Sequence, residues 1–152
     1  MDYRKEYEKW LASPALSEDE RAELRALEGN DKEIKARFYG PLEFGTAGLR
    51  GTMYTGLHNM NRHVIRWATQ GFANVIRAEG TEAMQKGIAV CMDCRNHSAE
   101  FARETACVMA ANGIHVRLFE SLRPTPELSF AVREYGCQAG VNVTASHNPK
   151  EY

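Results

Sequence analysis

The fold of this chain is indicated most directly by residues 139–149, with the sequence AGVNVTASHNP. Residues 139–143 form a short apolar run that predicts a buried strand, and residues 144–149 (the serine loop) follow it. In open α/β sheets, ligands and reacting groups gather in the loops at the carboxyl ends of the strands. A serine in such a loop can act as a covalent nucleophile or carrier when neighbouring groups activate it. Ser146 is therefore the first candidate for chemistry.

A second motif lies far upstream, at residues 44–51, with the sequence FGTAGLRG. Its glycines recur at every third position, where they permit a close approach of the backbone to a ligand or a positive φ. Arg50 stands among them, and its guanidinium offers a planar set of donors suited to phosphate. The spacing fits neither a dinucleotide-binding fingerprint nor a P-loop. The structural alternative is a tight hairpin with a solvated Arg50, just as residues 146–149 alone could be an ordinary turn.

Together these motifs resemble the α-D-phosphohexomutases, the superfamily of phosphoglucomutase and phosphomannomutase. The serine loop is similar to the phosphoserine loop of that superfamily, and residues 44–51 are similar to its N-terminal signature. The resemblance covers residues 41–152 and implies a three-layer α/β/α fold with a mostly parallel sheet, the first domain of the superfamily. Residues 1–40, with apolar side chains at helical spacing, predict a helical extension before this domain.

The resemblance implies that phosphorylated Ser146 donates its phosphoryl group to a sugar 1- or 6-phosphate, forming a bisphosphate that returns its other phosphoryl group to Ser146. Phosphate thus migrates between C1 and C6, or between C1 and C5 of a pentose. Arg50 would contact the phosphoserine or a bound phosphate. His147 would act on the sugar hydroxyl or the leaving oxygen, or order the loop, rather than deprotonate Ser146.

The resemblance also implies two small-molecule requirements. Phosphoryl transfer depends on charge neutralisation, which points to Mg²⁺ with one ligand supplied by the phosphoryl group on Ser146. Glucose 1,6-bisphosphate would serve as activator and intermediate. The partner of the protein is then a phosphosugar substrate.

Other residues are expected to support this site. Asp93 and Arg95 resemble a family segment after a predicted strand, and a pair between them would hold the neighbouring loops, with Ser98 as a helix cap. A direct contact of Arg95 with substrate is the alternative. Residues 123–126, RPTP (the proline loop), are expected to brace the serine loop, because two prolines fix its path. The remaining supporting residues are Thr46, Gly48, Thr144 and Asn148.

Three further loops of the superfamily are absent from this sequence: the carboxylate-rich metal loop, the sugar-recognition loop and the C-terminal phosphate-binding loop. We therefore expect a fragment that ends within the first domain, with the remaining Mg²⁺ ligands outside it and no mutase activity of its own. The chain resembles a branch with phosphoglucomutases and phosphopentomutases. Glucose phosphates are thus the first candidate substrates, and mannose or pentose phosphates are the alternatives. A non-catalytic α/β binding or interaction domain of the same family is the alternative from another class.

Composition and charge narrow the class of protein. With 152 residues the chain can bury one core, and its net charge of −1 suggests neither a nucleic-acid nor a membrane-surface partner. The sequence has no apolar run long enough to span a membrane and no signal-peptide core near Met1, so we expect a cytoplasmic protein. Its oligomeric state is not indicated.

Cys91 and Cys94 have the spacing of a metal or redox pair, but nothing completes a zinc site, so Cys91 and Cys107 are expected to be buried free thiols.

The remaining pattern predicts alternating helices and strands. In the extension we expect helices over 2–11, from Ser17 to 29–30, and over 31–38. The elements expected from residue 41 onward are a helix capped by Asn61 with Ile65, Ala68, Phe72, Val75 and Ile76 on one face, a strand over 87–92, a helix capped by Ser98 and closed by 112–113, a strand over 114–119, a helix capped by Thr125 and ending at 135–136, and the strand over 139–143. Strands separated by helices and short loops predict a mostly parallel sheet.

Overall fold

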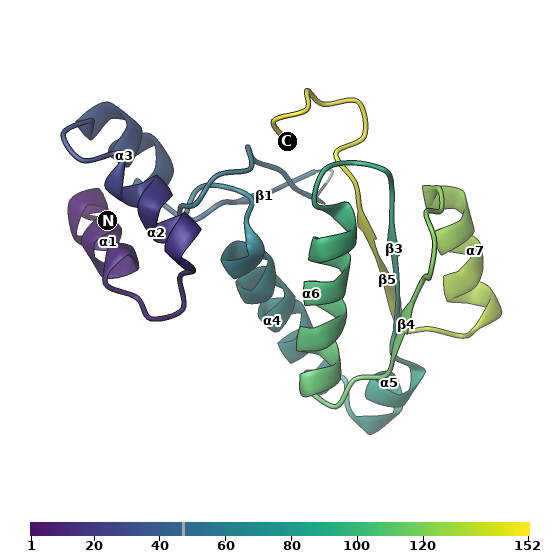
Figure 1. The fold of residues 1–152 in the computed structure, drawn as a ribbon. Coiled ribbons are helices and arrows are strands. Elements are labelled where there is room, and N and C mark those ends of the chain that lie inside the picture. Colours follow the sequence, from purple (N-terminus) through teal and green to yellow (C-terminus); the bar gives the residue numbers. More distant parts are fainter. Residues whose placement is uncertain (47) are drawn as a thin grey trace. The chain divides into compact units, whose positions relative to one another are not determined.

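The computed structural model describes residues 1–46 and 48–152 (Figure 1). The chain forms two compact units, one of Met1–Val64 with Glu151–Tyr152 and the other of Ile65–Lys150. Within the described residues, no helix combines the length and the apolar character needed to cross a membrane. The expectation of a cytoplasmic protein stays a prediction.

The first unit contains the three helices predicted for the extension. They are α1 (Tyr3–Leu11), α2 (Glu18–Arg25) and α3 (Asp31–Phe38). Their apolar faces meet around Leu24 and Phe38, which are fully buried. The predicted capping box opens α2, since the Ser17 hydroxyl accepts from the Glu20 N–H and the Glu20 carboxylate accepts from the Ser17 N–H. The glycine-rich motif follows as a short antiparallel hairpin of β1 (Phe44–Gly45) and β2 (Gly48–Leu49).

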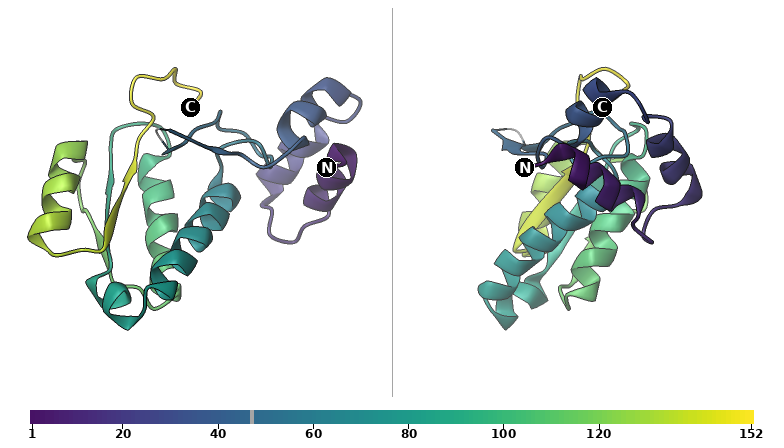
Figure 2. Two further views of the ribbon diagram at one scale, coloured as in Figure 1. Left: turned by 180° about the vertical axis from the view of Figure 1, so that it is seen from behind. Right: turned by 90° about the vertical axis from the view of Figure 1, so that its left-hand side faces the viewer.

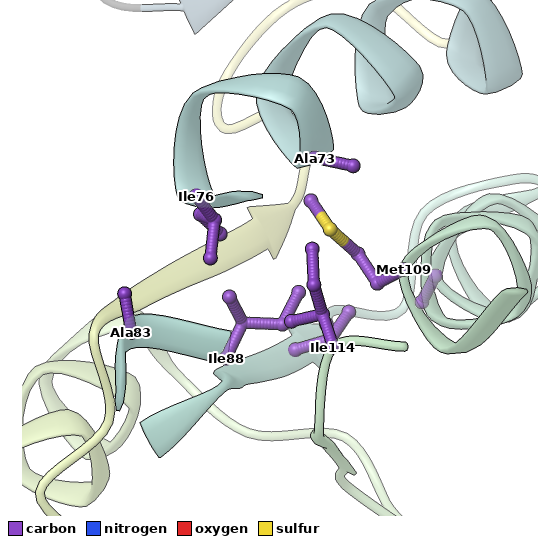
Figure 3. Packing of buried hydrophobic residues seen from close by; sticks show 8 residues of the cluster. Ala73, Ile76, Ala83, Ile88, Met109 and Ile114 are labelled. Atoms are coloured by element: carbon purple, nitrogen blue, oxygen red, sulfur yellow. The ribbon is translucent and has the colours of Figure 1, made fainter. Parts of the chain in front are cut away.

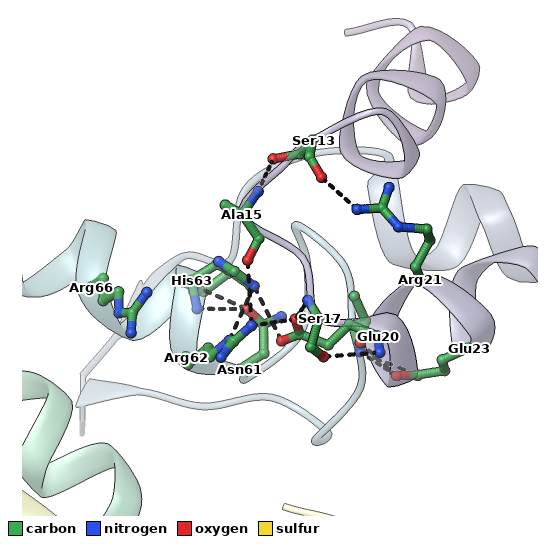
Figure 4. A network of polar contacts seen from close by, with 12 residues as sticks. Ser13, Ala15, Ser17, Glu20, Arg21, Glu23, Asn61, Arg62, His63 and Arg66 are labelled. Atoms are coloured by element: carbon green, nitrogen blue, oxygen red, sulfur yellow. Dashed lines mark hydrogen bonds and ion pairs between the residues drawn. The ribbon is translucent and has the colours of Figure 1, made fainter.

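A polar cluster joins α2 to the start of α4 (Arg62–Ala78) within the first unit (Figure 4). Arg62 donates to the Glu20 carboxylate at 2.6 Å, and His63 Nε2 lies 3.1 Å from the other carboxylate oxygen. The side-chain oxygen of Asn61 accepts from N–H groups in the first turn, so the predicted cap of α4 is confirmed. Burial raises the pKa of Glu20, but bonds from the α2 cap, Arg62 and His63 outweigh burial and leave the pKa below its usual value.

The second unit is built on a parallel sheet of β3 (Ile88–Met92), β4 (Val116–Leu118) and β5 (Ala139–Val143). The strand order is β4–β3–β5, and β3 pairs in parallel with both neighbours. Parallel strands end at the same edge of their sheet. The loops that follow β3 and β5 therefore emerge side by side, which is what the sequence pattern predicts for a site at this edge.

Helices cover both faces of this sheet (Figures 1 and 2). On one face lie α4 and α6 (Ser98–Ala111), and on the other lies α7 (Thr125–Glu134). The short helix α5 (Thr81–Lys86) precedes β3. The α/β fold predicted from the sequence, with a parallel sheet between two helical layers, is confirmed.

Alternate residues of β3 supply the core on each face of the sheet. Ile88 and Val90 point toward α4 and α6, where they join one apolar cluster (Figure 3). That cluster contains Ala73, Ile76, Ala83, Ile88, Val90, Ala102, Met109 and Ile114. Ala89 and Cys91 point toward α7 and pack with Leu128. The central strand is thus buried on both faces, as its nearly continuous apolar sequence predicts.

Two predicted helix caps are wrong by one residue. The N-caps of α6 and α7 are His97 and Pro124, and the predicted caps Ser98 and Thr125 are the first helical residues. The reason is that both hydroxyls have other partners. Ser98 donates to Asp93 at 2.8 Å, and Thr125 accepts from a side-chain amide of β5 at 2.6 Å.

Four smaller expectations differ from the structure. Val75 is 56% exposed, because the face of α4 that packs in the core carries Ile76 instead. Helix α2 ends at Arg25, since the residues after it form turns with bonds between residues three apart. Helix α5 was not predicted. The four cysteines are free as expected, but Cys107 is exposed whereas Cys91 is buried.

Candidate active site

Ser146 lies in the loop after β5, as predicted, and its side chain is exposed. Its φ is +51°, in the left-handed region that residues other than glycine rarely adopt. The Asn148 N–H donates to the Ala145 carbonyl at 2.9 Å and closes a turn around the serine. Such a conformation costs on the order of 1 kcal/mol, so the surrounding contacts must hold it.

Thr144 connects the serine to the neighbouring strand end. Its hydroxyl accepts a hydrogen bond from the Ser146 N–H at 2.8 Å and donates one to Asp93, which follows β3. Strands β3 and β5 are in parallel register up to Met92 and Val143, so the two residues that come next are neighbours. One hydroxyl therefore links the backbone of the serine to the loop after β3.

Asp93 holds several groups of the two loops at once. One of its carboxylate oxygens accepts from the Arg95 N–H at 2.9 Å and from the Ser98 hydroxyl at 2.8 Å, and the other accepts from Thr144. Burial raises the pKa of Asp93, but these three bonds and the charge of Arg95 outweigh burial and leave the pKa below its usual value. Asp93 is thus a carboxylate at neutral pH and acts as an acceptor only.

Arg95 binds the backbone of the serine loop directly. Its guanidinium donates to the carbonyls of Asn148 at 2.6 Å, Pro149 at 2.8 Å and Ser146 at 3.4 Å. The sequence predicts a pair between the Asp93 and Arg95 side chains. In the structure the backbone N–H of Arg95 meets Asp93, while the guanidinium reaches the serine loop. Asp93 and Arg95 thus both bond to residues of the serine loop, which agrees with the supporting position expected for them.

His147 lies beside the serine hydroxyl. Its Nδ1 is 3.2 Å from Ser146 Oγ, and both side chains are exposed. At this distance the imidazole can donate a proton to this oxygen or accept one from it. The two groups most suited to chemistry in the serine loop are therefore within hydrogen-bonding distance of each other.

The glycine-rich motif has the geometry of a tight hairpin. Gly48 has a φ of +98°, a conformation suited to glycine, and Thr46 lies exposed at the turn. Ala47 lies outside the described residues. The Arg50 side chain is exposed. Arg50 and Ser146 belong to different compact units, and their proximity stays a prediction.

Among the described residues, no cluster of acidic and metal-binding side chains lies at this site. Outside Ala47, the chain has no group of three or more His, Cys, Asp or Glu side chains that could hold a metal ion. Asp93, the carboxylate bonded to the serine loop, already accepts hydrogen bonds on both oxygens. Mg²⁺ takes several oxygen ligands in near-octahedral geometry, and its binding at Ser146 stays a prediction.

The sequence analysis missed one residue near this site, Asn142. Its side-chain amide lies in β5 and contacts Cys91 in β3 and Thr125 at the start of α7. The available signal was a polar amide within an otherwise apolar strand. A polar side chain in such a position needs hydrogen-bond partners to offset its burial.

Comparison with known proteins decides the family. Residues 41–152 match the family model described as phosphoglucomutase/phosphomannomutase, alpha/beta/alpha domain I. The chain belongs to this family. The membership predicted from the two motifs is thus confirmed, and the observed three-layer fold agrees with the alpha/beta/alpha description.

Several mutases are similar to the chain. It is 41% identical over 130 residues to the phosphopentomutase of Homo sapiens, which covers 82% of this chain and 21% of that protein. It is 39% identical over 122 residues to the phosphoglucomutase of Staphylococcus saprophyticus, covering 80% and 22%. It is 34% identical over 147 residues to the phosphomannomutase of Mycoplasma pneumoniae, covering 95% and 26%. The chain therefore spans about a fifth to a quarter of the length of these relatives. No solved structure shows significant similarity to it.

Proposed function

We propose that this chain is the serine-bearing domain of a phosphosugar mutase that interconverts sugar 1-phosphates and 6-phosphates through a phosphoserine at Ser146. The observation that carries the proposal is the exposed Ser146 hydroxyl on a loop whose backbone is bound by Arg95 and Thr144. Phosphoryl transfer depends largely on the positions of the attacking and leaving oxygens. Hydrogen bonds to the backbone of this loop restrict the positions that the serine oxygen can occupy.

In the proposed step, a hydroxyl oxygen of the sugar phosphate attacks the phosphorus on Ser146. A new O–P bond forms while the bond from Ser146 Oγ to phosphorus breaks. The proton count balances, since the sugar hydroxyl releases one proton and Oγ takes one up. His147 Nδ1, at 3.2 Å from Oγ, is in position to give that proton to the leaving oxygen. The reverse step returns the other phosphoryl group of the bisphosphate to Ser146.

Two further groups belong to the proposal. The Arg50 guanidinium would bind the phosphoserine or a substrate phosphate, since its fork of donors matches phosphate oxygens. Mg²⁺, bound through the phosphoryl group on Ser146 and through ligands outside this chain, would supply charge neutralisation. Glucose 1,6-bisphosphate is the proposed intermediate and activator.

The sugar is the finer part of the proposal. The similar proteins are a phosphopentomutase, a phosphoglucomutase and a phosphomannomutase. We propose glucose phosphates as the first substrate to test, with mannose and pentose phosphates as competitors. The choice among them depends on contacts with the sugar hydroxyls.

The test uses the full-length protein. The wild type, Ser146→Ala and a control, Ser129→Ala, are incubated with glucose 1,6-bisphosphate and Mg²⁺, and phosphate on residues 139–150 is located by mass spectrometry. Ser129 is an exposed serine on α7. Turnover is then followed with glucose 1-phosphate, mannose 1-phosphate and ribose 1-phosphate.

We expect phosphate on Ser146 in the wild type and the control, and loss of both phosphate and turnover in Ser146→Ala. Turnover of the alanine variant at the wild-type rate would falsify the role of Ser146. A wild type that takes up no phosphate and turns over none of the three sugars would identify the domain as a non-catalytic binding module.

A further inference from the structure

Asn142 occupies the central position of a polar chain that crosses the sheet on its α7 face. It lies in β5, directly in register with Cys91 of β3. Its side-chain oxygen accepts from the Cys91 thiol at 3.1 Å, and its amide nitrogen donates to the Thr125 hydroxyl at 2.6 Å. Three elements that are far apart in the sequence thus meet at one amide.

This contact lies close in sequence to the contacts of the serine loop. Asp93 and Thr144 directly follow β3 and β5, two positions beyond Cys91 and Asn142. The Cys91–Asn142 contact is therefore followed, one step closer to Ser146, by the contact between Asp93 and Thr144. The hydroxyl of Thr144 in turn binds the backbone of Ser146.

The proline loop is bound at both of its ends. At its first residue, the Arg123 N–H donates to the Met92 carbonyl, the last residue of β3, at 3.1 Å. Near its other end, Thr125 is bound by Asn142. Pro124 and Pro126 flank Thr125 and fix their own φ angles, so the backbone beside this attachment has little freedom.

We propose that Asn142 is a positioning residue of the serine site, which holds the proline loop in register with β5 and with the serine loop that β5 carries. The effect on catalysis rests on the mutase function proposed above. Without the amide, the proline loop keeps its bond to β3 and its continuation into α7, but it loses its bond to β5, the strand that carries the serine loop. The serine oxygen then samples more positions, and phosphoryl transfer slows.

The test is a double-mutant cycle in the full-length protein. Asn142→Leu removes the amide at similar volume, Thr125→Val removes the hydroxyl at similar shape, and Thr125→Ser retains the hydroxyl. Asn112→Leu is the matched control, because Asn112 also bonds through its amide but lies at the C-terminal end of α6, away from the serine edge. The readouts are kcat, KM, the melting temperature and hydrogen exchange of residues 144–149.

We expect Asn142→Leu and Thr125→Val each to lower kcat on the order of tenfold, the effect of about one hydrogen bond, with KM little changed. The double variant should be no slower than either single variant, because both remove the same bond. Thr125→Ser should retain the wild-type rate. Exchange of the serine loop should rise in Asn142→Leu and Thr125→Val but not in Asn112→Leu.

Two results would overturn the positioning role: additive losses in kcat, or a lower melting temperature with kcat and exchange unchanged. If Asn142→Leu does not fold, the comparison of Thr125→Val with Thr125→Ser decides by the same readouts. A wild type without turnover would overturn the mutase function alone, and exchange of the serine loop would then still show whether Asn142 holds it.

Discussion

The guanidinium of Arg95 donates a hydrogen bond to the backbone carbonyl of Asn148 at 2.6 Å, although the two residues are separated by 53 positions in the sequence. Arg95 belongs to the loop after β3, and Asn148 to the loop after β5. A side chain of one strand end thus fixes the backbone of the next. The serine loop is therefore ordered by its neighbour as well as by its own turn.

Replacement of Arg95 tests this relationship. Arg95→Lys keeps the positive charge but offers one compact ammonium, whose three donors cannot reproduce the spacing of the two guanidinium nitrogens that bind these carbonyls. We expect faster hydrogen exchange in residues 144–149 and a fall in mutase kcat on the order of tenfold or more. Arg133→Lys, on the exposed side of α7, is the control and should change neither. Unchanged exchange in Arg95→Lys would contradict the role assigned to its guanidinium.

The lowered pKa of Asp93 predicts a dependence of stability on pH. A carboxylate whose pKa is lower in the folded state stabilises the fold above its unfolded pKa, and the contribution is lost as the pH falls through the folded pKa. We expect the free energy of unfolding to fall below about pH 4, near the unfolded pKa of aspartate. Asp93→Asn should be less stable at neutral pH and should show a shallower decline. Parallel pH curves for the two proteins would show that Asp93 does not contribute.

Local sequence patterns predict the elements whose causes are themselves local. The capping box at Ser17 and the helix over Asp31–Phe38 depend on residues three or four positions apart, and the structure reproduces both. The apolar runs of β3 and β5 likewise identify strands, but only β3 is buried as predicted, because β5 lies at the edge of the three-stranded sheet and its residues are half-buried or exposed. The serine loop then follows at the correct end of its strand.

Features set by distant partners could not be predicted in this way. Ser98 and Thr125 read as caps, because a hydroxyl before a helix usually binds its first turn. In the structure Thr125 bonds to Asn142, 17 positions away, and no local pattern carries that information. The acceptors of Arg95 are backbone carbonyls, which every residue has. Its position in the loop was therefore predictable, but its partners were not.

Two glycines with similar backbones predict very different costs of substitution. Gly87 and Gly136 have φ values of +66° and +60°. A Cβ at Gly87 would lie 2.0 Å from the carbonyl oxygen of His115, which accepts the Ile88 N–H between β3 and β4. A Cβ at Gly136 meets nothing within 4 Å. Gly136→Ala should cost about 1 kcal/mol for its backbone alone, whereas Gly87→Ala should cost more than about 3 kcal/mol. Urea unfolding of both variants measures the difference, and equal costs would contradict the close approach of these strands.

Arg50 offers the sharpest test of whether the glycine-rich hairpin binds phosphate. Its side chain is exposed, as expected both for a guanidinium that waits for a phosphate and for one that is merely solvated. Arg50→Lys keeps the charge and loses the fork, so phosphate binding by Arg50 predicts a fall in kcat/KM on the order of tenfold or more. Arg25→Lys, an exposed arginine at the end of α2, controls for general effects of the change. Stability should be unaffected in both variants, because exposed substitutions rarely alter it. If the kinetics of Arg50→Lys match those of Arg25→Lys, the hairpin is structural, and the phosphate ligands lie elsewhere in the protein.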